Sequence, residues 1–172
     1  MKGGNIKIVL TIFFVGGLFA VPNAQSDVGE PLLAKPGFDM KLVTRGQYLL
    51  KTSGCNDCHT PGYMPSKGKV PDGLWLTGDT FGWRGPWGTT YGSNLRILVD
   101  NLTEEQWVSM AKTFRARPPM PWFNLNAMTT DDLSAMYQFI SYLGPSGKLA
   151  LPYVSPDQEP TGPHAIFPAP PK

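Results

Sequence analysis

The chain has 172 residues, of which 41% are hydrophobic and 16% are charged. These proportions suit one globular domain with extensions, and they exclude a charge-rich disordered chain and a protein with several membrane spans. The formal net charge is +2, and it falls to zero without the first 24 residues, which hold Lys2 and Lys7 but no acid. Nucleic-acid binding is therefore not expected, because phosphate recognition needs clustered positive charge.

The first residues have the pattern of an export signal. Lys2 and Lys7 form a short positive segment before an apolar run from Ile8 to Val21. That run is too short to cross a hydrocarbon core of about 30 Å, but it has the length of a signal-peptide core. Ala24 offers a small residue for cleavage, although Pro22 departs from the usual pattern. We predict a signal peptide over residues 1–24, a periplasmic mature protein and no stable membrane span; a buried apolar helix is the alternative.

Helical periodicity occurs at three places after a polar lead-in over residues 25–41. Apolar residues at i, i+3, i+4 and i+7 spacing indicate the first and third helices. A Thr and a Gln three residues later form a capping box before the second. The predicted helices run from Leu42 to Thr52, where Gly54 can end the helix, from Thr103 to about Phe114, and from Thr129 to Gly144.

Glycine and proline dominate two other stretches, and together they make up about a fifth of the chain. Residues 60–100 combine them with tryptophans and are predicted to be a long irregular loop, which usually has a function in a compact domain. Its aromatic side chains either order on a flat apolar cofactor or are ordinary core residues. Residues 145–172 are predicted to be a Pro-rich extended tail that Tyr153, Ile166 and Phe167 could hold against the domain.

Cys55, Cys58 and His59 form a C-x-x-C-H motif, the attachment sequence of c-type haem. Each thiol can add across one haem vinyl group, and the two-residue spacer matches the separation of those vinyls. His59 then follows the second anchor and is placed to bind the iron. We expect its other ring N–H to donate to a backbone carbonyl, that of Pro61 or Pro71.

Two other interpretations of the cysteines are weaker. A thioredoxin-like thiol pair belongs in a βαβ unit, whereas a predicted helix leads into this motif. A zinc site needs four ligands, and Cys55, Cys58, His59 and His164 are the whole Cys and His content of the chain. A disulfide between Cys55 and Cys58 would close a tiny loop and add little stability. The expected cofactor is one covalent haem c with its iron.

The second axial ligand decides the function, because a closed iron site transfers electrons and an open one binds small molecules or activates peroxide. Met120 is the predicted ligand, since the flanking prolines hold an extended loop and remove backbone donors. Met64 follows His59 too closely to round the haem edge easily. The alternatives are Met120 as a core gap-filler and His164 as the ligand.

With these motifs the chain resembles the monohaem class I cytochromes c, in particular the cytochrome c subunits that serve periplasmic dehydrogenases. The resemblance covers about Leu42 to Gly144 and leaves residues 145–172 outside it. It implies an all-α fold of about three main helices around one haem, with Met120 as distal ligand and a helix crossing near Gly46 and Tyr137. It depends on four stretches of sequence: RGQYL, CNDCHT, GTTYGSN and PPMPWF with the helix that follows.

The resemblance also implies a function. It is that of a periplasmic electron carrier rather than an enzyme, with His59 and Met120 on the iron, a dehydrogenase as donor and an oxidase or another cytochrome as acceptor. The alternative is an open-site haem protein that acts as a peroxidase-like enzyme or gas sensor. Where relatives often read Asn-Ile-Thr-Pro, this chain reads NLRI. The candidate contacts to the haem propionates are Trp87, Tyr91, Asn94 and Arg96, and the alternative for Arg96 is a solvated charge.

Overall fold

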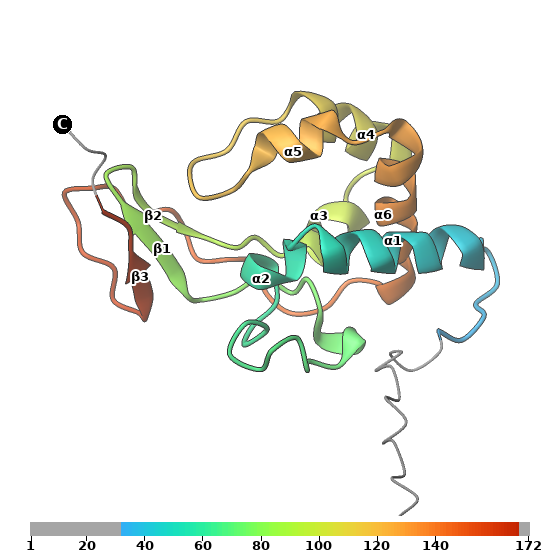
Figure 1. The fold of residues 1–172 in the computed structure, drawn as a ribbon, viewed down its shortest axis with the longest axis horizontal. Coiled ribbons are helices and arrows are strands. Elements are labelled where there is room, and N and C mark those ends of the chain that lie inside the picture. The colour runs from blue at the N-terminus through green and yellow to red at the C-terminus, as the bar shows by residue number, and fades with distance from the viewer. Residues whose placement is uncertain (1–31, 169–172) are drawn as a thin grey trace, which may run out of the picture. The chain divides into compact units, whose positions relative to one another are not determined.

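The computed structural model describes residues 32–168, so the predicted signal peptide over residues 1–24 and most of the lead-in lie outside the described residues. The described residues belong to one structural unit that begins at Leu32. Within it, the helices accompany a small sheet (Figure 1). No helix in this part of the chain has the length and apolar character needed to cross a bilayer.

The elements include helices, a 3-10 helix and strands. In chain order they are α1 (Met40–Thr52), α2 (Cys55–His59), the 3-10 helix η1 (Asp72–Leu74), β1 (Gly82–Gly85), β2 (Gly88–Tyr91), α3 (Leu95–Asp100), α4 (Glu104–Thr113), α5 (Trp122–Ala127), α6 (Thr130–Leu143) and β3 (His164–Ile166).

The three predicted helices are confirmed as α1, α4 and α6. Helix α1 begins two residues early because the Asp39 carboxylate accepts from the backbone N–H of Lys41 at 2.8 Å. The capping box of α4 is complete, since Thr103 and Gln106 each bond to the other's backbone N–H. Local signals of this kind determine where the long helices start.

Helices α1 and α6 cross at Gly46. A Cβ there would overlap the carbonyl oxygen of Ala135 and lie 2.8 Å from the Cβ of Phe139, so only glycine fits. The sequence predicted Tyr137 as the aromatic residue at this crossing, and that prediction is wrong, because Phe139 occupies the position. Residues four apart share one helix face, and Tyr137 lies off that face, where its hydroxyl donates to the Leu102 carbonyl at 2.9 Å.

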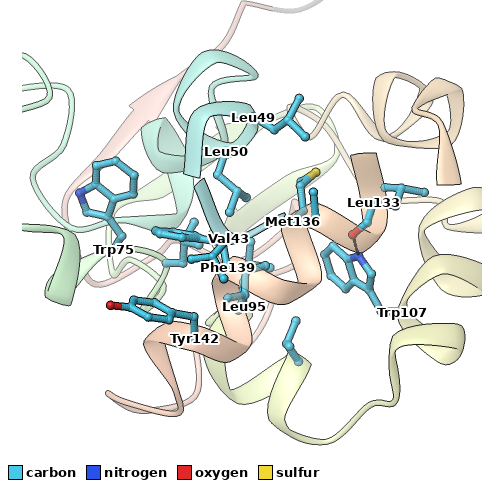
Figure 2. Close-up of a cluster of buried hydrophobic side chains, with 14 of the residues drawn as sticks. Val43, Leu49, Leu50, Trp75, Leu95, Trp107, Leu133, Met136, Phe139 and Tyr142 are labelled. Atoms are coloured by element: carbon cyan, nitrogen blue, oxygen red, sulfur yellow. Dashed lines mark hydrogen bonds between the residues drawn. The ribbon is translucent and has the colours of Figure 1, made fainter. Parts of the chain in front are cut away.

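The core forms around this crossing (Figure 2). Val43 and Leu50 of α1 pack with Phe139 of α6, and all three are fully buried. The Trp107 indole N–H donates to the Leu133 carbonyl at 2.9 Å, which joins α4 to α6. The end of α1, and with it the start of α2, is thus held by the most buried part of the chain.

The prediction of an all-α fold is wrong, because the described residues include a three-stranded mixed sheet in the order β2-β1-β3. Strands β1 and β2 pair antiparallel, with Gly85 opposite Gly88 at the turn. Gly88 has a φ of 95°, which the two-residue connection needs and which L side chains rarely adopt. The residues 60–100 predicted to be irregular thus contain η1, both strands and α3.

The tail is extended, as predicted, but its end is part of the sheet: β3 pairs in parallel with β1, with Gly82 opposite His164. Arg84 of β1 holds the approach to β3, donating to the carbonyl of Gln158 at 2.8 Å and to the carboxylate of Glu159 at 2.7 Å. Strand pairing and Arg84 thus integrate the tail into the domain.

Aromatic contacts add to this attachment. The Tyr153 hydroxyl donates to the Trp87 carbonyl at 2.8 Å, and the Phe167 ring lies 5.4 Å from the Trp87 ring and 6.0 Å from the Trp83 ring. Ile166, which was also expected to hold the tail, is 76% exposed and does not do so. Neighbouring residues of an extended chain face opposite sides, so Ile166 points to solvent where Phe167 packs against the tryptophans.

Candidate functional site

The C-x-x-C-H motif forms the short helix α2, which follows α1 at once. Gly54, with a φ of 73°, ends α1 and begins α2, the left-handed position that was predicted for it. Cys55 and Cys58 are three residues apart on this helix, so both thiols lie on one face. No disulfide joins them. The pair is therefore free to bind one flat group from the same side.

His59 is 8% exposed, and its Nδ1 lies 2.7 Å from the carbonyl oxygen of Ser93. A carbonyl only accepts, so Nδ1 carries the proton and Nε2 keeps its lone pair. Burial lowers the pKa of His59, and the hydrogen bond to Ser93 opposes that shift. The imidazole is thus neutral and oriented, as a metal ligand would have to be. The supporting carbonyl belongs to neither Pro61 nor Pro71, the two that the sequence suggested.

Both thiols have raised pKa values. Burial, with a contribution from Asp57, raises the pKa of Cys55 to about 12 and that of Cys58 to about 11. Thioredoxin-like cysteines react as thiolates and need a depressed pKa. The environment of Cys55 and Cys58 does the opposite, so the structure argues against a thiol redox centre.

Two loop segments press against the backbone of α2. The N–H of Gly78 donates to the His59 carbonyl at 2.9 Å, and the N–H of Asp79 donates to the Gly92 carbonyl at 3.0 Å. Gly92 packs so closely that an added Cβ would overlap the Cys58 carbonyl oxygen and lie 2.7 Å from its carbon. This close approach brings Ser93 within reach of His59.

A buried polar pair fixes the other side of α2. The Thr60 hydroxyl donates to the Asn56 side-chain oxygen at 2.7 Å and accepts from the Leu76 N–H at 2.8 Å. Asn56, Thr60 and Leu76 are all fully buried. Sequence reasoning missed this network, because the partner at Leu76 lies in a segment that has no regular structure.

Met120 lies half-buried in the loop between α4 and α5. The loop is held to β2, because the Thr90 hydroxyl donates to the Pro118 carbonyl at 2.8 Å. From the end of β2 at Tyr91 the chain runs on through Gly92 to Ser93, whose carbonyl oxygen contacts His59. The strand that holds the Met120 loop is therefore followed, after Gly92, by the residue that supports His59.

Trp87 and Tyr91, two of the candidate propionate contacts, belong to the β1–β2 hairpin. Trp87 lies in the turn, where its indole N–H donates to the Trp83 carbonyl at 3.3 Å. Tyr91 ends β2, opposite Gly82. Both side chains are half-buried, and their role toward a cofactor stays a prediction.

Asn94 and Arg96 have structural partners that the sequence did not reveal. Asn94 caps α3 and donates to the Ser146 carbonyl at 2.7 Å. Arg96 is 6% exposed, and its guanidinium donates to three backbone carbonyls, those of Gly73, Leu143 and Gly144. These bonds hold α3 against the end of α6 and satisfy carbonyls that the helix leaves open.

Replacing Arg96 with methionine is expected to lower the free energy of unfolding by about 3 kcal/mol, because three carbonyls lose a charged donor. Urea unfolding measures it. Arg45→Met is the control, since Arg45 is half exposed in its ion pair with Asp132 and the change should cost under about 1 kcal/mol. Equal effects of the two substitutions would contradict the structural role of Arg96.

A metal-ion site of the zinc type finds no support among residues 32–168. No three His, Cys, Asp or Glu side chains of this part of the chain come together in a way that could hold a metal ion. His164 starts β3 instead, with its Nδ1 2.9 Å from the Gly162 carbonyl oxygen.

Comparison with known protein families, with characterised proteins and with solved structures found no match for the chain. Its function is therefore argued from its own residues. The donor set fits a c-type haem: two unpaired thiols three residues apart on one helix face, and a neutral histidine next to the second.

Proposed function

We propose that this chain is a periplasmic electron carrier that holds one haem c through Cys55 and Cys58. The observation that carries the proposal is the geometry of His59, which follows Cys58 directly and has Nδ1 held by the Ser93 carbonyl, so that the lone pair is on Nε2. Each thiol would add its S–H across one vinyl double bond of the haem, so that sulfur would bond to one carbon and hydrogen to the other. This addition is redox-neutral and needs no oxidant.

The bound haem would supply one-electron Fe(III)/Fe(II) chemistry, and the chain's part is to hold it in one state of ligation. His59 would hold the iron through Nε2, and its hydrogen bond to Ser93 increases the basicity of that nitrogen. Met120 would supply a thioether ligand from the loop that Thr90 holds to β2. Both ligands come from supported backbone, so little of the chain needs to move when the charge changes.

The proposed partners are a periplasmic dehydrogenase as donor and an oxidase or another cytochrome as acceptor. Without its signal segment the chain has no net formal charge. Electrostatic steering is therefore weak, and the docking surface is expected to be largely apolar. Reduction rates should change little across a salt series.

A denaturing gel stained for haem tests the proposal. The protein, expressed with a periplasmic haem-attachment system, should retain one haem after denaturation, and Cys55→Ala with Cys58→Ala should lose it. His59→Ala should change the absorption spectrum, whereas the control His164→Ala should not, because His164 lies in β3. A wild-type band without stain would overturn the proposal. Carbon monoxide binding to the reduced protein at neutral pH would favour the open-site alternative.

A further inference from the structure

A cavity of about 270 Å³ lies beside α2, and it is separate from the two proposed iron ligands, neither of which lines it. Three segments converge on it: the loop after α2, the segment that leads into β1, and the residue before β3. It extends from exposed residues such as Met64 to the buried ring of Tyr63. Its lining is mostly apolar: Tyr63, Met64, Pro65, Phe81, Trp83 and Pro163.

The aromatic walls are held in place by their neighbours. Tyr63 packs edge-on against Trp75, with ring centroids 5.8 Å apart. Phe81 and Trp83 pack edge-on at 5.5 Å, and Trp83 also contacts Phe167 from the tail. The cavity is thus preformed, and its volume lies just below the range of small-ligand sites, which begins at about 300 Å³.

Two carboxylates, Asp57 and Asp79, also line the cavity. Asp79 is fixed by the Phe81 N–H, which donates to it at 3.0 Å. Within residues 32–168 the ion pairs join Arg45 to Asp132 and Arg84 to Glu159, so neither cavity carboxylate has a cationic partner there. No lysine, arginine or histidine lines the cavity. The site is therefore negatively charged.

We propose that this cavity binds a small organic ammonium cation. Aromatic faces attract cations through their negative quadrupole, and Tyr63, Phe81 and Trp83 supply three such rings. Asp57 and Asp79 supply the balancing charge. A bare Ca²⁺ or Mg²⁺ ion fits less well, because it needs six or more oxygen ligands and most of this lining is carbon.

The ammonium group could come from a free alkylated amine or from a lysine side chain of a partner protein. The chemistry is the same in both cases: a cation with alkyl substituents between aromatic rings, next to two acids. The inference does not depend on the haem proposal, because it needs none of Cys55, Cys58, His59 or Met120.

Calorimetry on the exported protein as isolated tests the inference with choline and with its uncharged isostere 3,3-dimethylbutan-1-ol. Choline should bind at least about tenfold more tightly than the alcohol, because only the cation gains from the rings and the carboxylates. Asp79→Asn keeps an oxygen for the Phe81 N–H and should weaken choline binding about tenfold. The control Asp100→Asn, at the exposed end of α3, should leave it unchanged.

Butylammonium serves as the mimic of a lysine side chain. Tighter binding of choline assigns the cavity to a free quaternary amine, and tighter binding of butylammonium assigns it to a lysine; both support an ammonium site. Equal binding of choline and the alcohol, an unaffected Asp79→Asn variant, or no binding of either cation would overturn the inference. None of these results would change the haem-stained gel, so the two proposals fail separately.

Discussion

Replacing Gly92 with alanine is expected to destabilise the protein by about 3 kcal/mol or more and to reduce haem attachment sharply. The added Cβ would overlap the Cys58 carbonyl oxygen and lie 3.4 Å from the Cα of His59. Both obstacles are backbone, so no side-chain rotation relieves them. Either α2 or the end of β2 must shift, and a shift of β2 moves the Ser93 carbonyl away from His59.

Gly73→Ala is the matched control, because a Cβ at that position meets nothing within 4 Å. That substitution should change the free energy of unfolding by less than about 0.5 kcal/mol. Urea unfolding and the haem stain of periplasmic extracts measure the two effects. Gly92→Ala protein with the stability and haem content of the control would show that α2 does not depend on this close packing.

The parts of the fold that sequence could predict are those fixed by neighbouring residues. The Thr103–Gln106 capping box starts α4 within one turn of itself, and the apolar stripe of α6 is visible in the sequence. The sheet was missed because its strands have four, four and three residues, too few for a clear period. Strand β3 also gains its partner from a distant part of the chain.

The same division holds for the site. Cys55, Cys58 and His59 are contiguous and could be found by spacing alone, whereas their supports are far away in sequence. Ser93 is 34 residues from His59. Arg96 bonds to the Gly144 carbonyl 48 residues on, which is why a charge that resembled a cofactor contact has a structural role. Non-local contacts of this kind leave no periodic signal in one sequence.

If the protein binds haem as proposed, replacing Met120 with leucine is expected to remove an Fe–Met absorption band at about 695 nm from the oxidised spectrum and to lower the reduction potential, because a thioether ligand favours Fe(II). Leucine conserves the volume of methionine, so a folding cost of less than about 1.5 kcal/mol is expected. The reduced variant should also bind carbon monoxide, since leucine cannot ligate iron. Visible spectra and redox titration measure these changes.

Met110→Leu is the matched control, because Met110 is also half-buried and lies in α4, just before the loop that carries Met120. It should keep the band, the potential and the closed iron site. If Met120 only fills space, the two variants will lose similar small amounts of stability and neither will change the spectrum. The hydrogen bond from Thr90 to the Pro118 carbonyl gives a reason to expect a ligand role. It holds the chain two residues before Met120 against β2, and β2 is followed by Ser93, which contacts His59.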